Sequence, residues 1–201
     1  MAVRTNEKLR ELYAEPRERS LRKQLDRLDP HCRRFLELSP FCVLATTGAD
    51  GLPDATPRGG EPGFVHVLDE RTLLLPDRPG NNRLDSLGNL VTHPGVGLLF
   101  FVPGVDETLR VNGTCELRDD PELLARFEHG GKLPATVLVV SVREAYLHCA
   151  KALMRSRLWD PEARIERSTL PSLGEMLRDQ LDLAEAETQD EMVERYRQSL
   201  Y

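Results

Sequence analysis

The residues best suited to chemistry follow a run of three leucines at residues 73–75. Arg78 and Arg83 flank a break rich in proline and glycine, and Asn81 and Asn82 lie between them. The later leucines recur at helical spacing, so the stretch predicts a buried strand, a turn and a helix capped by Asn81 or Asn82. Helix N-termini and arginines both favour phosphate. The stretch is therefore a candidate phosphate site, or else a surface turn with two solvated arginines.

Simple energetics predicts that this turn alone binds an anion weakly. A charge-assisted hydrogen bond contributes about 1.5–3 kcal/mol and a helix terminus about 0.3–1 kcal/mol. Two arginines and a helix terminus therefore supply about 4–7 kcal/mol, which corresponds to binding between millimolar and tens of micromolar. Tighter binding needs an apolar body on the ligand, such as a flat ring attached to the phosphate.

Arg58 is a second candidate source of positive charge. It lies in the sequence Pro57-Arg58-Gly59-Gly60, at the end of a short strand predicted over residues 53–57. Pro53 and Pro57 cannot donate to a sheet ladder, so the pattern predicts an edge or bulged strand. Unpaired backbone groups and glycines would let a ligand approach closely. The alternative is a glycine-rich loop with an exposed arginine.

A third polar cluster comes near the end of the last predicted strand. It contains His148, Lys151, Arg155 and Arg157 and ends at Trp159, the single tryptophan. We assign catalytic roles to His148, Lys151 and Arg155, because the cations can hold an anionic substrate and a histidine transfers protons near neutral pH. The alternatives are salt bridges between subunits for the cations and a core position for Trp159.

Composition narrows the class of protein. The chain has 201 residues, of which 40% are hydrophobic, and a formal charge of −6 from 33 acidic and 27 basic side chains. An acidic balance argues against a nucleic-acid partner. No apolar run approaches about 18 residues and no leader is recognisable, so we expect a cytoplasmic protein without a membrane partner. The four cysteines occur singly and predict buried thiols, and no histidine spacing predicts a metal site.

The elements that position these residues follow from the hydrophobic period. Strand-like segments recur at residues 41–47, 53–57, 64–68, 71–75, 96–102, 107–117 and 133–147, and helical patterns occur within residues 1–38 and at 84–90, 121–127, 171–183 and 188–200. Residues 96–102 are wholly apolar and predict a strand buried on both faces. The fold class predicted is mainly β with helices (α+β): an antiparallel barrel of six or seven strands, closed or partly closed, with helices at both ends.

Three parts are expected along the chain. Residues 1–38 form an N-terminal helical extension packed on the barrel, residues 39–160 form the barrel domain, and residues 161–201 form a C-terminal helical extension, with Asp29-Pro30 breaking the first part.

The segments CVLATTGADGLPDATPRGG, LPDRPGNNRLDSLGNL, HPGVGLLFFVPG and ETLRVNGTCEL occur in that order. This order resembles the pyridoxamine 5′-phosphate oxidase-like family of FMN-binding split barrels, over about residues 35–150. The segment HCAKALMRSRLW, with TPRGG and RVNG, resembles a branch of FMN-dependent enzymes other than the authentic oxidase.

The resemblance implies a homodimer that binds two FMN molecules in clefts between subunits. It places phosphate contacts on the second strand and on the strand-to-helix turn, and Thr108 near the polar edge of the flavin ring. The oxidase's Ser-Arg-Lys run is replaced by Asn81-Asn82-Arg83, so Arg78 or Arg58 must supply a missing positive charge. The expected cofactor-binding residues are Thr56, Pro57, Arg58, Gly59, Asp77, Arg78, Asn81, Asn82, Arg83, Thr108, Arg157 and Trp159.

Two functions follow from these expectations. The first is an FMN-dependent oxidoreductase that acts on a small, anionic or conjugated substrate, with the flavin supplying the redox chemistry. The oxidase's substrate-binding tail is not recognisable, so oxidation of vitamin B6 is not expected. The alternative is a non-catalytic flavin or haem binding protein for storage or sensing. The turn and its arginines favour a phosphate-bearing ligand over haem, for which only His148 is a candidate axial ligand.

Overall fold

The computed structural model describes residues 2–200 and begins with three helices. They are α1 (Asn6–Leu12), α2 (Glu18–Arg22) and α3 (Pro30–Leu38). The predicted break at Asp29-Pro30 is confirmed, because Asp29 caps α3 by accepting a hydrogen bond from the backbone N–H of Cys32 at 2.8 Å. Leu36 of α3 is buried in the barrel core, whereas residues 2–24 are all exposed.

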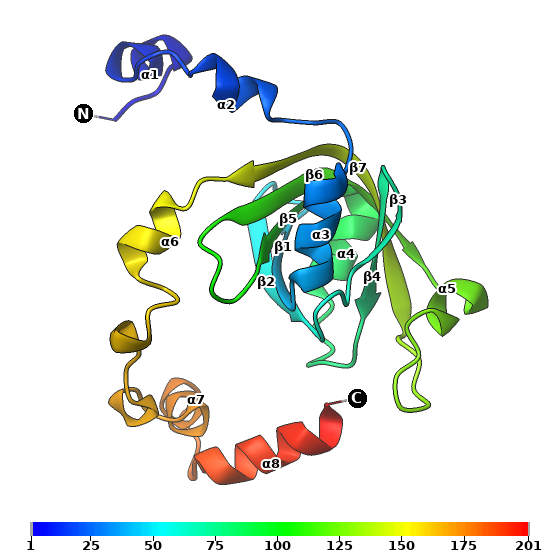
Figure 1. Cartoon of the computed structure of the whole chain (residues 1–201). Coiled ribbons are helices and arrows are strands. Elements are labelled where there is room, and N and C mark those ends of the chain that lie inside the picture. The colour runs from blue at the N-terminus through cyan, green and yellow to red at the C-terminus, as the bar shows by residue number, and fades with distance from the viewer. Residues whose placement is uncertain (1, 201) are drawn as a thin grey trace.

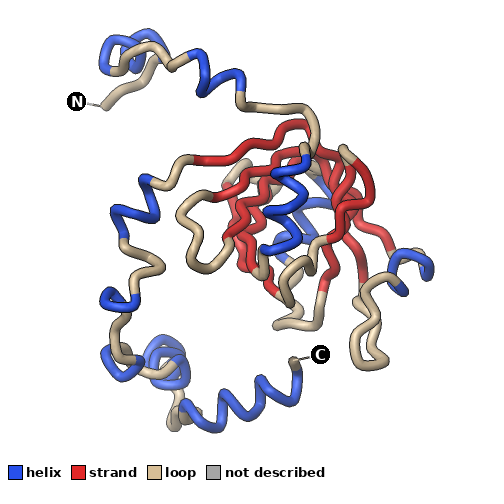
Figure 2. Tube along the Cα trace, viewed as in Figure 1, coloured by secondary structure: helices blue, strands red, loops and turns tan. Residues whose placement is uncertain are grey.

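Seven strands form one sheet in which every pairing is antiparallel. They are β1 (Phe41–Thr47), β2 (Pro53–Gly59), β3 (His66–Asp69), β4 (Thr72–Asp77), β5 (Gly95–Phe101), β6 (Thr108–Arg118) and β7 (Thr136–His148). Their order is β2-β1-β5-β6-β7-β4-β3. Figure 2 shows the strands gathered into one curved unit with helices at both ends of the chain, so the predicted fold class is confirmed.

The two ends of the strand order meet at the candidate site. β2 is an edge strand, as its prolines predict. Arg58 on β2 forms an ion pair with Asp77 at the end of β4, and both side chains are largely buried. Because β4 lies near the opposite end of the strand order, this ion pair links the two sides of the sheet and helps to close it.

The interior of the sheet is filled by aliphatic side chains and by Phe100. The expectation that β5 is buried on both faces is wrong. Val96, Leu98 and Phe100 are buried, but the residues between them are only half-buried. The reason is that no helix in the described chain covers the outer face of β5, so an apolar composition does not by itself mean two covered faces.

Five further helices follow within residues 2–200. They are α4 (Asp85–Thr92), α5 (Pro121–Ala125), α6 (Lys151–Ser156), α7 (Leu173–Leu181) and α8 (Gln189–Ser199), with two short 3-10 turns between α6 and α7. α4 packs against β1, β2 and β6. After α6 the chain runs in an arc beside and then below the barrel as drawn in Figure 1. Within residues 2–200 no helix has the length and apolar character needed to span a membrane.

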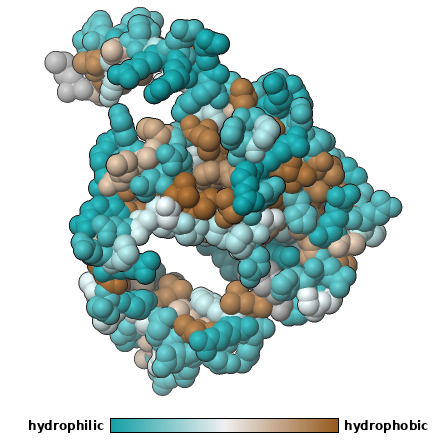
Figure 3. Space-filling view, in the orientation of Figure 1, coloured by the Kyte–Doolittle hydropathy of each residue, from teal (hydrophilic) through white to brown (hydrophobic). Residues whose placement is uncertain are grey.

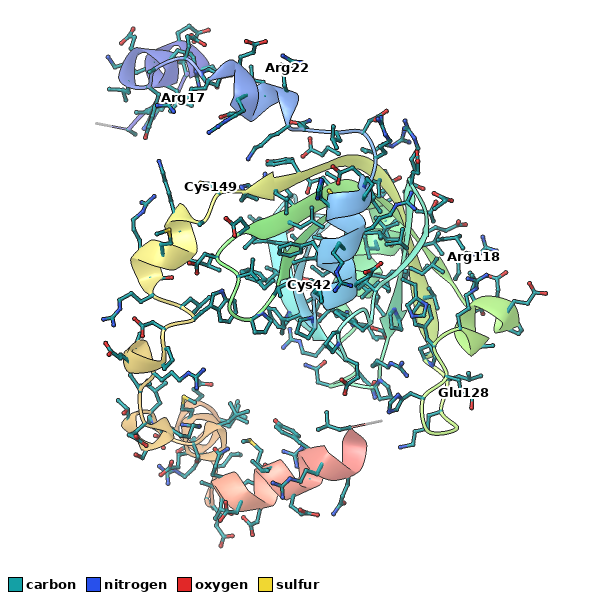
Figure 4. All side chains as sticks on the ribbon, in the orientation of Figure 1. Arg17, Arg22, Cys42, Arg118, Glu128 and Cys149 are labelled. Atoms are coloured by element: carbon teal, nitrogen blue, oxygen red, sulfur yellow. The ribbon has the colours of Figure 1, made fainter. Side chains whose placement is uncertain are left out.

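Three of the four cysteines are buried thiols, as predicted, but Cys149 is exposed. It follows the end of β7, where the chain leaves the barrel, while Cys42 lies inside the barrel (Figure 4). Burial raises the pKa of Cys32, Cys42 and Cys115 to about 12, because the interior does not solvate a thiolate.

We expect a thiol reagent at pH 8 to label one cysteine per native chain and four per unfolded chain. Only Cys149 is accessible in the folded state, and the buried thiols remain protonated at this pH. The measurement is labelling stoichiometry by mass spectrometry, with Cys149→Ser as the control that abolishes native labelling. Rapid labelling of a second thiol in the native protein would contradict the burial described here.

Candidate functional site

The turn between β4 and α4 differs from the prediction at the helix cap. The N-cap residue is Leu84, not Asn81 or Asn82, and no side chain caps the first turn. The side-chain oxygen of Asn81 instead accepts a hydrogen bond from the backbone N–H of Arg83 at 3.1 Å, and Asn82 has a left-handed backbone with a φ of 56°. The first N–H groups of α4 are therefore available to an anionic ligand.

Leu84 also has a left-handed backbone, with a φ of 61°. A branched aliphatic residue in this conformation costs about 1–2 kcal/mol. Such strain commonly occurs at ligand sites, where the surrounding structure holds the backbone in place. Contacts with the rest of the structure therefore hold the turn in a conformation that is locally unfavourable for Leu84.

A cavity of about 420 Å³ lies between β2, the β4–α4 turn and the start of α4. Seven of the predicted cofactor-binding residues line it: Thr56, Arg58, Asp77, Arg78, Asn81, Asn82 and Arg83. The volume is in the range of small-molecule sites, about 300–1,000 Å³. The structure therefore brings the two sequence-distant arginine clusters into one cavity.

The charges in this cavity are matched. Besides the ion pair of Arg58 with Asp77, Arg83 Nε donates to Asp85 Oδ2 at 2.8 Å. Arg58 Nε is buried and has no hydrogen-bond partner among the described residues. A buried donor without a partner costs about 1–3 kcal/mol, which an anionic ligand at this point would recover.

A polar network that the sequence interpretation missed fixes α4 against the barrel. Ser86 in the first turn of α4 donates to Asp54 Oδ2 at 2.8 Å, and Asn89 donates to Thr46 Oγ1 at 3.0 Å. Asp54 and Ser86 both line the cavity. Asp54 could have been found from strand alternation, because Asp54, Thr56 and Arg58 occupy one face of β2.

Three other predicted cofactor-binding positions on the barrel lie outside this cavity. Pro57 occupies the other face of β2, opposite Val43, and Gly59 lines a neighbouring cavity of about 230 Å³. Thr108 is buried at the start of β6, directly opposite His148 on β7. Thr108 thus belongs with the third polar cluster and not with the arginines.

The third cluster is also separate from the cavity within one chain. Lys151 and Arg155 are exposed on α6, and Arg157 pairs with Asp160 at 2.6 Å and with Glu162 at 3.2 Å. Trp159 Nε1 donates to the backbone carbonyl of Val105 at 2.9 Å. None of these residues lines the cavity, so one copy of the chain divides the predicted site residues into two groups.

His148 lies among groups that keep its ring neutral. Burial lowers its pKa, and the positive charges of Arg110 and Lys23 lower it further. The His148 ring lies 4.9 Å from the ring of Tyr146, and its buried Nε2 has no hydrogen-bond partner among the described residues. Neutral His148 can accept a proton, whereas no described residue lining the arginine cavity is a histidine, lysine or cysteine.

The comparisons with known proteins identify the barrel. The family model for pyridoxamine 5′-phosphate oxidase matches residues 28–149. No curated protein matches the chain.

Several solved structures resemble the chain at low identity. HupZ from Group A Streptococcus is 14% identical and covers 59% of this chain and 92% of its own, with a TM-score of 0.49. A Clostridium acetobutylicum protein related to general stress protein 26, of the pyridoxinephosphate oxidase family, is 16% identical. The match covers 59% of this chain and 85% of the Clostridium protein, with a TM-score of 0.46. An F420 reductase is 21% identical, and the match covers 58% of this chain and 94% of the reductase, with a TM-score of 0.41.

Proposed function

The chain belongs to the pyridoxamine 5′-phosphate oxidase family, and we propose that it binds FMN in the arginine cavity and uses it as an oxidoreductase. The observation that carries the proposal is the meeting of Arg58, Arg78 and Arg83 at the uncapped start of α4. Arginines and free helix N–H groups together form a phosphate site. This arrangement joins parts of the chain that are some 20 residues apart.

The donors present fit the phosphate of FMN. Arg58 and Arg83 supply guanidinium groups, the first turn of α4 supplies backbone N–H groups, and Thr56 supplies a hydroxyl. Asp77 orients Arg58, and Asp54 orients the first turn of α4 through Ser86. FMN, when bound, supplies hydride or electron transfer. The residues of this chain bind and orient it.

A second copy of the chain completes the proposed site. The three arginines of the cavity are matched by Asp54, Asp77 and Asp85, so one chain contributes no net positive charge there. A phosphate dianion needs additional cations, and α6 carries Lys151 and Arg155 on its exposed surface. In the proposed homodimer these cations, with Arg157, Trp159 and His148, face the flavin of the partner and hold a small anionic or conjugated substrate.

A non-catalytic flavin binder is the second candidate. It is favoured by one observation: the described residues that line the cavity include aspartates, arginines and asparagines but no histidine, lysine or cysteine. If the α6 cluster does not reach the cavity of another copy, the chain holds the cofactor without supplying a proton donor or acceptor.

We expect the purified protein to take up FMN and to bind riboflavin about a hundredfold less tightly. The phosphate accounts for the difference, because two charge-assisted hydrogen bonds contribute about 3 kcal/mol or more. Quenching of flavin fluorescence on titration measures both affinities. Equal affinity for the two flavins would place the phosphate outside the arginine cavity. If the protein takes up neither flavin, the proposed function is wrong.

Reduction of the bound flavin separates the enzyme from the binder. NADH or NADPH is mixed with the loaded protein without oxygen, and reoxidation is followed after candidate acceptors are added. Reduction followed by acceptor-dependent reoxidation supports the oxidoreductase. A bound flavin that no donor reduces supports the binder.

A further inference from the structure

The N-terminal extension, residues 2–24, is exposed along its whole length. Its apolar side chains are exposed, including Leu9 at 39%, Leu12 at 58% and Leu21 at 60%. The segment contains seven basic and four acidic residues, giving a formal charge of +3. Figure 4 shows Arg17 and Arg22 on this extension, away from the barrel. The extension reaches the barrel at its end, where Lys23 Nζ donates to the backbone carbonyl of Leu147 at 2.6 Å and Gln24 donates to Glu144 at 2.7 Å. Leu25 then pairs with Ala145 of β7.

The C-terminal arm, residues 161–200, has the opposite charge and a similar apolar surface. It contains ten acidic and five basic residues, so it carries −5 of the −6 charges of the chain. Along α7, Leu173, Leu177 and Leu181 recur every four residues and are 37%, 39% and 62% exposed. A stripe of this spacing normally faces a packed neighbour.

The arm is nevertheless a formed unit. At Gly174, α7 packs so closely on the loop leading into α8 that an added Cβ would lie 1.9 Å from the backbone carbonyl oxygen of Glu187. Arg195 holds Glu187 with two hydrogen bonds of 2.7 and 2.8 Å, and Met192 of α8 is buried. The hairpin of α7 and α8 therefore has an inner side, which it covers itself, and an outer leucine stripe, which it does not.

Within residues 2–200, the leucines of α1 and α2 and the leucine stripe of α7 stay exposed. Helices shorter than about 12–15 residues are marginal in water unless an apolar face is packed. Figure 1 shows α1 and α2 at one end of the molecule and α7 and α8 at the other, with the barrel between them. Figure 3 shows hydrophobic residues at the surface of the C-terminal arm, on the side that faces the barrel.

We propose that the C-terminal arm of one copy packs on the N-terminal extension of a second copy. The two segments have opposite charge, +3 and −5, and each presents exposed leucines. In a two-fold dimer the same contact forms twice: the C-terminal arm of each copy packs on the N-terminal extension of the other. This inference rests on the homodimer in the proposed function and specifies which elements join its subunits.

Cysteine cross-linking between differently tagged chains tests the proposal. One chain carries Leu12→Cys and the other Leu177→Cys, both in a Cys149→Ser background that removes the exposed native thiol. Oxidation of the mixed full-length proteins is expected to give a product that carries both tags. The matched control replaces Leu177→Cys with Val91→Cys, on the exposed surface of α4, where Val91 is 77% exposed.

Each outcome is decisive for the extensions. A cross-link within one doubly substituted chain would show that the arm folds onto its own N-terminal segment, and absence of any specific cross-link would also overturn the proposal. If the protein is dimeric and binds FMN but gives no Leu12–Leu177 cross-link, the proposed packing of the extensions is wrong while the proposed function stands. A monomer would remove the homodimer as well.

Affinity measurements supply a second test that does not use cysteine. Leu177→Lys is expected to raise the dimer dissociation constant about 10- to 100-fold, because it removes a buried leucine from each contact. Gly174→Ala should act in the same direction without altering the exposed stripe, since the added Cβ would push α7 away from the loop that leads into α8. Val91→Lys is the control that should leave the dimer unchanged. Equal dissociation constants for all these variants would contradict the proposal.

Discussion

Replacing both Arg58 and Arg83 with alanine is expected to weaken FMN binding about 10²- to 10⁴-fold. Each arginine offers a charge-assisted hydrogen bond to phosphate, and the loss of two such bonds corresponds to about 3–6 kcal/mol. Arg58 accounts for the larger part, because it is largely buried while Arg83 is exposed. Titration of the apoprotein with FMN measures the change.

The control for this double variant is Arg118→Ala. Arg118 is also paired with an aspartate, Asp120, at 2.7 Å, but it lies outside the arginine cavity. Arg58→Ala also leaves Asp77 without its partner, so a second variant, Arg58→Ala with Asp77→Asn, separates loss of binding from loss of folding. If that folded variant bound FMN as tightly as the wild type, Arg58 would have no role in holding the phosphate.

Gly113→Ala is expected to destabilise the barrel by about 3 kcal/mol or more. A Cβ at this position would lie 2.0 Å from the backbone carbonyl oxygen of Ser141, which no side-chain rotation can relieve. Gly113 lies at an irregularity in the pairing of β6 with β7, where the two backbones approach closely. Overpacking in a core typically costs about 1–3 kcal/mol, and a backbone clash in the centre of a sheet falls at or above the upper end.

Urea denaturation measures this effect. The matched control is Gly95→Ala at the start of β5, where an added Cβ meets no atom within 4 Å. We expect the control to change the free energy of unfolding by less than about 1 kcal/mol. A similarly small change for Gly113→Ala would mean that β6 and β7 can separate locally without cost.

The strands were predictable from sequence because hydrophobic period and breakers act locally. Pro53 and Pro57 identified an edge strand, and the alternation along residues 107–117 identified a strand with one buried face. The outer face of β5 could not be predicted, because its exposure depends on which other elements lie over the sheet. The composition of a segment can predict that it is a strand, but it does not predict which elements cover its two faces.

The candidate site was predictable only in part. Arg58 and the turn that contains Arg83 were each identifiable, yet their meeting depends on the curvature of the whole sheet. The cap of α4 was predicted wrongly because Asn81 has two competing uses, as a helix cap or as an acceptor within the turn, and the structure uses the second. Whether the α6 cluster faces the cavity of another copy stays a prediction, since pairing between chains leaves no local pattern.

The ion pair between Arg58 and Asp77 couples changes at the candidate site to the stability of the barrel. The same guanidinium joins the two sides of the sheet and serves the proposed ligand, so a substitution that tuned affinity at Arg58 would also alter how firmly the barrel closes. A new ligand preference at the candidate site would therefore evolve most easily at exposed positions such as Arg83, where a substitution leaves the closure of the sheet intact.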